Sequence, residues 1–344
     1  MERKPFHHPR VRPEWLATLR EDIIEPAQPI IDPHHHLWKA RPDQYLLEDL
    51  VADVRTGHNV LSTVFIQCRS EYRKDGPEAL RPVGETEFVA AIAAESETGK
   101  YGAFRACPGI IGHAECLLGD GIDVTLEAHI EAGSGRFKGI RDSGTYDAGI
   151  EPTAPPGAPA GLYREAAFQR GVKRLEKHGL TFEAWLYHPQ HGDLLDLLKT
   201  CTNQKIVFNH LGGPLGVGPY EGKRKEVFAQ WAASMRELAK APNLFMKLGG
   251  LAMNVNGFGY HNRPLPPGSG EMAKAWGPYV EVAVDAFGAD RCMFESNFPV
   301  DKGMCSYPVL WNAFKRIAAG CSADEKAALF HRTAARFYSL PAVG

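Results

Sequence analysis

Short apolar runs and longer amphipathic runs alternate along the chain. The short runs are rich in β-branched and aromatic residues, which is typical of strands. We predict eight strands, at residues 30–36, 62–68, 102–111, 137–142, 180–188, 205–210, 244–248 and 291–297. The longer runs repeat apolar residues every three or four positions, as Phe168, Val172 and Leu175 do, which is the spacing of a buried helix face. Eight strand and helix pairs in alternation predict an α/β fold of the (β/α)8 type, a TIM barrel.

The length of the chain leaves room for more than a minimal barrel. Such a barrel needs about 250 residues, and the chain has 344. We therefore predict an N-terminal extension over residues 1–28, a single barrel domain over 29–344, and long loops. The charged segment 69–82 and the segments 151–161 and 256–270, which are rich in proline and glycine, each follow a strand and precede a helix. In barrels of this type, such loops lie over the active face.

Composition and charge restrict the class of partner. The net charge is -2 and the basic residues are scattered, so neither a nucleic acid nor an anionic membrane is an expected partner. The seven cysteines include no C-x-x-C pair, and we interpret them as reduced thiols. The first residues do not resemble a signal peptide, and no apolar run is long enough to span a bilayer. We expect a cytoplasmic protein that binds a small-molecule substrate. Formation of a homo-oligomer is compatible with the sequence.

The segment 30–38 carries the clearest chemical signal. It reads Ile-Ile-Asp-Pro-His-His-His-Leu-Trp, an apolar strand that runs directly into three histidines. Because alternate side chains of a strand share a face, His34 and His36 should point to one side and His35 to the other. An expression tag would stand at a terminus, and a solvated turn would not follow directly on an apolar strand. The pair is therefore a candidate binding site for an ion or a substrate.

Polar residues suited to chemistry stand at the ends of other predicted strands. Arg141 lies at the end of the fourth strand, His188 and His210 end the fifth and sixth, and Asn297 ends the eighth. A single buried histidine is commonly satisfied by a backbone carbonyl. Several imidazoles that converge from different strands would be costly to desolvate for packing alone, whereas a divalent ion or an anionic substrate gives them a common partner.

Four motifs carry a family resemblance: D-x-H-x-H-L-W at 32–38, H-x-G-G-P at 210–214, K-L-G-G at 247–250 and S-N-F-P at 296–299. With them the chain resembles the amidohydrolase superfamily, in the branch of the lactonases for sugar lactones and pyrone dicarboxylate and the related decarboxylases. The resemblance implies that His34, His36 and His188 bind one divalent metal ion, for which we expect zinc. It also implies that His210 is the acid/base or carbonyl-polarising residue. The pyrone lactonases of this family work without a metal, so a metal-free site is the alternative.

One position departs from the family pattern. The family usually carries a strand-eight aspartate, in a Ser-Asp-x-Pro setting, as metal ligand and general base, and this chain has Asn297 there. An amide cannot accept a proton at neutral pH. We expect Asn297 to be a hydrogen-bonding group of the site, with His210 transferring the proton. Asp301 is the alternative base, and Glu295 should lie deeper in the barrel. Asp301 could instead be an exposed loop carboxylate paired with Lys302.

The cationic residues suggest what is bound. Charges that face into a barrel are costly without an anionic partner, so Arg141 and Lys247 predict a substrate that carries a carboxylate. The alternative for Lys247 is an internal ion pair with a barrel carboxylate such as Glu183. Further candidates on the loops are Arg69 and Arg263 for the carboxylate, and Tyr72, His261 and Trp38 as walls of the pocket.

These observations predict a hydrolase of a small cyclic ester, a lactone that carries a carboxylate. The first alternative is a metal-dependent decarboxylase of a carboxylated aromatic or unsaturated acid. The second is a catalytically degraded barrel that binds an acidic metabolite. Asn297 favours the second alternative, and the histidines retained at several strand ends argue against it.

Overall fold

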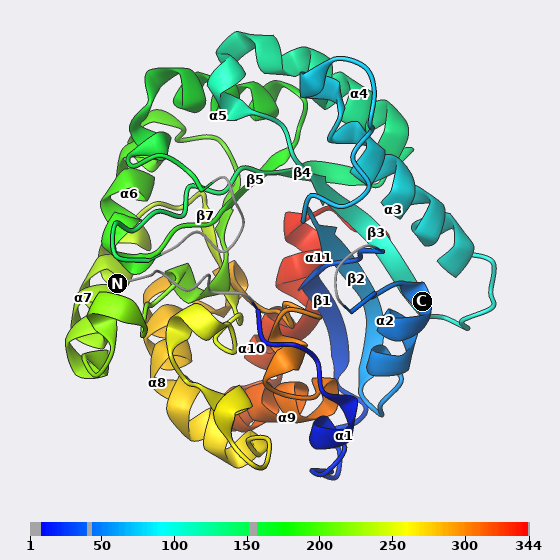
Figure 1. Cartoon of the computed structure of the whole chain (residues 1–344), viewed down its shortest axis with the longest axis vertical. Coiled ribbons are helices and arrows are strands. Elements are labelled where there is room, and N and C mark those ends of the chain that lie inside the picture. Colours follow the sequence, from blue (N-terminus) through cyan, green and yellow to red (C-terminus); the bar gives the residue numbers. More distant parts are fainter. Residues whose placement is uncertain (1–7, 40–42, 151–156, 343–344) are drawn as a thin grey trace.

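The computed structural model describes residues 8–39, 43–150 and 157–342. Its eight parallel strands lie side by side in sequence order and form a nearly closed barrel (Figure 1). They are β1 Pro29–His35, β2 Asn59–Ile66, β3 Arg105–Gly112, β4 Phe137–Arg141, β5 Thr181–Ala184, β6 Ile206–Phe208, β7 Leu244–Leu248 and β8 Cys292–Phe294. The predicted (β/α)8 fold is confirmed. Of the loop 151–161, residues 151–156 lie outside the described residues, as do residues 1–7 of the N-terminal extension.

Six strands end earlier than the hydrophobic pattern indicated, and three of them end just before candidate site residues. β5 ends at Ala184, β6 at Phe208 and β8 at Phe294, and tight turns follow at His188–Gln190 and His210–Gly212. The reason is that the apolar pattern continues into these turns, where the backbone leaves the extended conformation. The polar residues expected on strand ends therefore lie just beyond them, on turns at the carboxyl edge of the barrel.

The first and last strands are joined beyond the end of β8. The backbone N–H of Asn297 donates to the carbonyl of His34 at 2.9 Å, and the N–H of His36 donates to the carbonyl of Phe298 at 2.8 Å. The buried Asp32 carboxylate accepts the N–H of Ser296 at 3.0 Å. The motifs at 32–38 and 296–299 thus meet, and they complete the barrel as well as carrying site residues.

Eight helices surround the strands: α2 Leu47–Val54, α3 Val83–Ser96, α4 Asp123–Gly133, α5 Ala166–Lys177, α6 His191–Thr200, α7 Arg224–Leu238, α8 Ser269–Phe287 and α9 Tyr307–Ile317 (Figure 1). On α5, Phe168, Val172 and Leu175 are fully buried, as their spacing predicted. Among the described residues, no helix combines the length and apolarity needed to cross a membrane. The seven cysteines are all free thiols.

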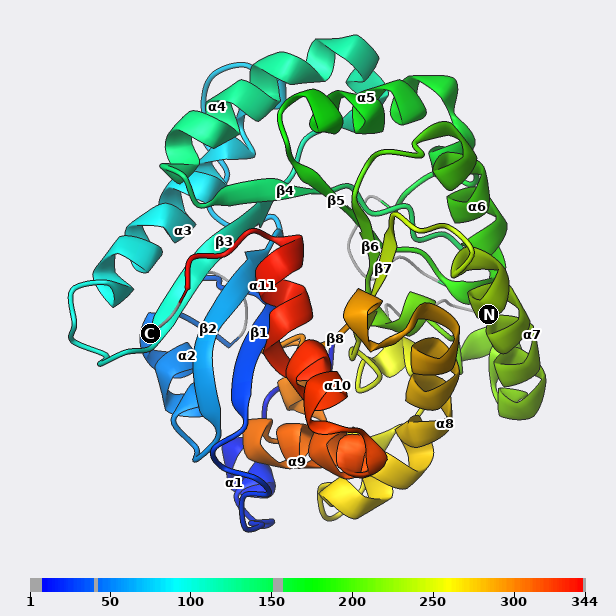
Figure 2. The ribbon, with the colours of Figure 1, turned by 180° about the vertical axis from the view of Figure 1, so that it is seen from behind.

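The amino ends of the strands are covered by the end of the chain. Two short helices, α10 Ala323–Ala327 and α11 Thr333–Phe337, follow α9, and α11 lies across the barrel when it is seen from behind (Figure 2). Phe337 and Tyr338 pack against Ile31, Val64 and Met293 in a small apolar cluster. The Tyr338 hydroxyl reaches further inward and donates to the Glu183 carboxylate. The C-terminal helix therefore closes one end of the barrel and contacts its charged interior.

The N-terminal segment lies against the loop that follows β7. It includes α1, Pro13–Leu16. The Arg12 guanidinium donates to the carbonyl of His261 at 2.6 Å, and the Trp15 indole donates to the carbonyl of Arg263 at 3.0 Å. The Glu21 carboxylate accepts the N–H of Ser269 at 2.7 Å, at the start of α8. The extension thereby holds the second half of the β7–α8 loop.

Candidate functional site

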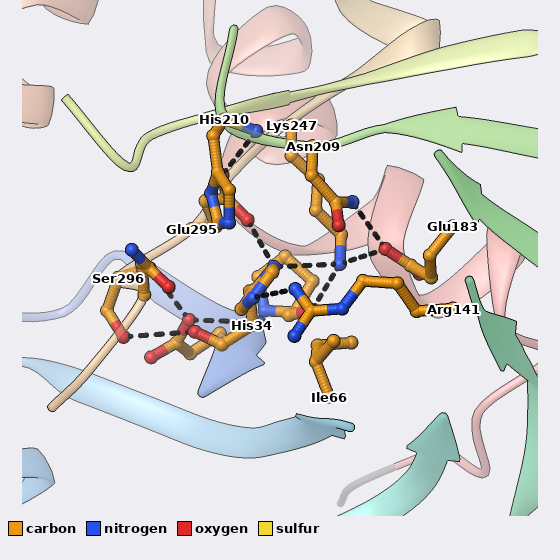
Figure 3. A network of polar contacts seen from close by, with 12 residues as sticks. His34, Ile66, Arg141, Glu183, Asn209, His210, Lys247, Glu295 and Ser296 are labelled. Carbon is orange, nitrogen blue, oxygen red and sulfur yellow. Dashed lines mark hydrogen bonds and ion pairs between the residues drawn. The ribbon is translucent and has the colours of Figure 1, made fainter. Parts of the chain in front are cut away.

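Five titratable side chains from five strands meet inside the barrel (Figure 3). His34 comes from β1, Arg141 from β4 and Lys247 from β7, while His210 and Glu295 follow the ends of β6 and β8. All five are buried, and Arg141 is the most exposed at 8%. Burial makes an unpaired charge costly, so the contacts among the five determine what the cluster can do.

His34 lies at the centre of this cluster. Its Nδ1 is 2.7 Å from Oε2 of Glu295 and 3.3 Å from Nζ of Lys247. Its Nε2 is 3.4 Å from a guanidinium nitrogen of Arg141. Burial, and after it the positive charge of Lys247, holds the pKa of His34 well below its usual value. We infer a neutral ring. Both of its nitrogens lie beside a cationic donor, and Oε2 of Glu295 is left without a hydrogen-bond partner in the described chain.

His210 contacts the other oxygen of the same carboxylate. Its Nδ1 is 2.7 Å from Oε1 of Glu295, and its backbone N–H donates to that oxygen at 3.0 Å. Burial lowers the pKa of His210, although the charge of Glu295 acts in the opposite direction. With Nδ1–H directed at Glu295, the unprotonated nitrogen is Nε2, for which the described chain provides no hydrogen-bond partner. A neutral imidazole of this kind can accept a proton.

Arg141 is a buried cation without a carboxylate partner among the described residues. Its Nε donates to the side-chain oxygen of Gln67 at 3.2 Å, and Nη2 donates to the carbonyl of Gln67. Its remaining contact is the neutral ring of His34. Gln67 was not predicted to belong to the site. Its only signal in the sequence is that it follows an apolar run. Arg141 is therefore held in place by neutral acceptors, and its charge is available to an anion.

Lys247, in contrast, is paired inside the barrel. Its Nζ is 2.7 Å from Oε2 of Glu183 and donates to the carbonyl of Pro33 at 2.9 Å. Glu183 also accepts from the Asn209 amide at 2.5 Å and from the Tyr338 hydroxyl. The internal ion pair considered as an alternative is thus present. With Lys247 completely buried beside His34, its charge is largely compensated before any substrate binds.

The three histidines expected to bind a metal do not form one cluster. The rings of His34 and His36 are on the same side, with centroids 5.0 Å apart, as the strand alternation predicted. His36 uses Nδ1 on the carbonyl of Ile66 at 2.7 Å. His188 accepts the N–H of Leu215 at 3.2 Å, and its Nε2 is buried without a partner in the described chain. The ligand atoms of this trio are not all within 4.8 Å of one another.

Asn297 and Asp301 are bonded to each other. The Asn297 amide nitrogen donates to Asp301 at 2.8 Å, and the N–H of Ala252 donates to the second oxygen of Asp301 at 3.1 Å. Asp301 is completely buried, which raises its pKa well above the usual value. The idea of an exposed carboxylate paired with Lys302 is wrong, because Lys302 pairs with Asp53 at 2.7 Å. Both oxygens of Asp301 already accept hydrogen bonds from the protein.

The loop candidates lie further out. Arg69 is exposed on the segment after β2, and Tyr72 on the same segment is half-buried. His261 is half-buried on the β7–α8 loop, where Arg12 holds its carbonyl. Their expected role toward the substrate stays a prediction.

The described chain contains one group of three ligand-type residues within 4.8 Å, namely His34, His210 and Glu295. Two histidines and a carboxylate are a donor set that zinc uses. The arrangement does not fit the ion, however, because Nδ1 of His34 lies 3.3 Å from the Lys247 ammonium and Nε2 of His34 faces Arg141. An ion on that nitrogen would stand beside a buried guanidinium. We therefore route no step through a metal.

Known proteins resemble the chain over most of its length. It is 32% identical over 335 residues to the uncharacterized protein y4mH of Sinorhizobium fredii, covering 90% of this chain and 98% of that protein. It is 25% identical over 313 residues to an L-fucono-1,5-lactonase of Burkholderia multivorans, covering 90% and 96%. A solved amidohydrolase from Burkholderia multivorans, with bound zinc, shares the fold with a TM-score of 0.70 at 23% identity, covering 91% and 99%.

The family model described as amidohydrolase matches residues 31–340, which spans the barrel from β1 to the segment after α11. The match includes the strand-end residues of the buried cluster and leaves the whole N-terminal extension, residues 1–28, outside. By this match, and by the relative at 32% identity, the chain belongs to the amidohydrolase family and is a hydrolase-type enzyme.

Proposed function

We propose that the protein hydrolyses a small cyclic ester, a lactone that carries a carboxylate. The observation that carries this proposal is Arg141, a buried cation that the described chain leaves without a carboxylate. It stands beside two neutral imidazoles, His34 and His210, at the carboxyl end of the barrel. A fixed cation beside a base is suited to an anionic substrate that reacts with water. The relatives named as L-fucono-1,5-lactonases support the reaction type.

In the proposed reaction His210 acts as base and then as acid. Its Nε2 takes a proton from water while the water oxygen bonds to the lactone carbonyl carbon. Arg141, whose position is fixed before the substrate arrives, holds the substrate carboxylate while the carbonyl oxygen becomes an oxyanion. As the ring C–O bond breaks, His210 returns the proton to the leaving oxygen. The product is the open-chain hydroxy acid, and the imidazole is neutral again.

A panel of lactones tests this proposal. We expect lactones that carry a carboxylate to be hydrolysed fastest. The released acid is measured by titration at constant pH. Release of CO2 from carboxylated aromatic or unsaturated acids without lactone hydrolysis would assign the decarboxylase alternative. Tight binding of carboxylated compounds without any turnover would assign the binding-only alternative.

Removal of metal should leave the activity intact. Since His34 lies between the cations Lys247 and Arg141, and the proposed base is Nε2 of His210, no step of the proposed reaction requires an ion. We expect protein dialysed against a strong chelator to retain its kcat and to contain far less than one metal per chain by elemental analysis. Stoichiometric zinc, together with activity that is lost on chelation and restored by zinc alone, would contradict this prediction.

A further inference from the structure

Gln67 is the residue that holds the Arg141 guanidinium. It follows β2, and its backbone N–H donates to the carbonyl of Ile111 on β3 at 2.8 Å. Nε of Arg141 donates to Oε1 of Gln67 at 3.2 Å, and Nη2 donates to the backbone carbonyl of the same residue. Gln67 is 7% exposed and Arg141 is 8% exposed. One residue therefore supplies two acceptors to a desolvated cation, and both acceptors are neutral.

The buried carboxylates near Arg141 are engaged with other groups. Glu183 pairs with Lys247 at 2.7 Å, and Glu295 contacts the two histidines of the cluster. Oε1 of Glu85 accepts two backbone N–H groups from the segment that follows β2, at 3.0 and 2.7 Å. Burial lowers the pKa of Arg141, and these three carboxylates oppose that shift without forming an ion pair with it in the described chain. A substrate carboxylate could therefore reach the guanidinium without displacing a carboxylate of the protein.

The neutral amide of Gln67 matters because a carboxylate would fit in the same place. Glutamine and glutamate have the same shape, so a glutamate at position 67 would put a charged oxygen where Oε1 now accepts from Nε of Arg141. A guanidinium binds a carboxylate more strongly than it binds an amide. The cation would then be satisfied inside the protein, and a substrate carboxylate would meet a second negative charge.

We propose that Gln67 determines the preference of the site for an anionic substrate. Its side chain orients Arg141 and, being neutral, leaves the positive charge to the carboxylate of the substrate. Arg141 is the group that contacts this carboxylate, and Gln67 is a positioning residue that acts through it. The effect of Gln67 on lactone turnover rests on the proposed hydrolysis, whereas its effect on anion binding does not.

Gln67→Glu is the informative substitution, because it changes the charge of this residue and keeps its shape. We expect kcat/KM for carboxylated lactones to fall by about 10²-fold or more, since two desolvated carboxylates would compete for one guanidinium. Neutral lactones should change by less than about tenfold, because they bring no charge to meet the new carboxylate. A residue with only a structural role would lower both rates equally, so the measured quantity is the ratio of the two rates.

Anion binding is measured separately from turnover with a ring that cannot be hydrolysed. The probes are tetrahydrofuran-2-carboxylate and its neutral carboxamide, and their dissociation constants are obtained by calorimetry at neutral pH. The wild-type protein should prefer the acid, and Gln67→Glu should lose this preference as Arg141→Ala does. Gln28→Glu is the matched control, because it makes the same change in charge at the amino end of β1, where Gln28 donates to the carbonyl of Pro29 at 3.2 Å. It should keep the wild-type preference.

Gln67→Met keeps the proposal testable if Gln67→Glu fails to fold. It leaves Arg141 unpaired, so it should still prefer the acid, although Nε loses its acceptor and binding becomes weaker. Equal binding of acid and amide by the wild-type protein would overturn the proposal. So would a folded Gln67→Glu variant that still prefers the acid, or a Gln67→Met variant that loses the preference as completely as Arg141→Ala. If the preferences follow the prediction but no lactone is hydrolysed, the role of Gln67 stands and the proposed reaction fails.

Discussion

Replacement of His210 by alanine should remove most of the turnover, by about 10² to 10⁴-fold, because the substitution deletes the proposed general base. The neutral imidazole is the working form, so activity falls as the pH falls through the pKa of His210. Burial lowers that pKa from the usual 6.5, although Glu295 opposes the shift. The acidic limb of the kcat/KM profile should therefore lie below pH 6.5 in the wild-type enzyme and be absent in His210→Ala.

His178 provides the control for this substitution. It follows α5 on the outer ring of helices and pairs with Asp123 at 3.2 Å, far from the strand ends that carry the cluster. His178→Ala should leave the acidic limb in place. A His210→Ala enzyme with nearly normal kcat and an unchanged limb would show that the base lies elsewhere, and Asp301→Asn would then become the decisive variant.

Replacement of Arg141 by alanine should weaken kcat/KM for carboxylated lactones by about 2 to 5 kcal/mol, the cost of removing one partner of a desolvated charge pair. The effect should appear mainly in KM, because the substrate carboxylate is bound in the ground state. Arg141→Lys is the matched control. It keeps the charge but cannot donate to both oxygens of Gln67 and to the substrate at once, so its loss should be intermediate.

Neutral lactones separate the two roles that Arg141 could have. If it binds the carboxylate, Arg141→Ala should affect neutral lactones much less than carboxylated ones. Equal turnover of both classes, unaffected by the substitution, would remove the carboxylate from the proposed substrate.

The barrel could be predicted because its signal is local. Alternation within each strand and the spacing of Phe168, Val172 and Leu175 follow from the geometry of a single element. The same local rule placed His34 and His36 on one side of β1, which the ring contact confirms. It could not show where strands end, because the apolar pattern of β5 and β6 runs into turns that place His188 and His210.

The partners of the charged residues depend on contacts between distant parts of the chain. Lys247 was expected to bind the substrate, with an ion pair to Glu183 as the alternative, and the structure has that pair. Because Glu183 lies 64 positions away, no local pattern could decide between the two. Glu295 was expected to lie too deep, because the strand was drawn to 297. β8 ends at Phe294, and the irregular segment beyond it brings the carboxylate to the two histidines.

The closure of the barrel floor by α11 has a consequence for the order in which the protein forms. Tyr338 donates a hydrogen bond to Glu183, and Glu183 in turn holds Lys247 beside His34. During synthesis the strands emerge before this tyrosine, so the ion pair stays in contact with water until the last turn of helix docks. A chain that is truncated before Tyr338 would keep its barrel strands, but its buried ion pair would lack this hydrogen bond.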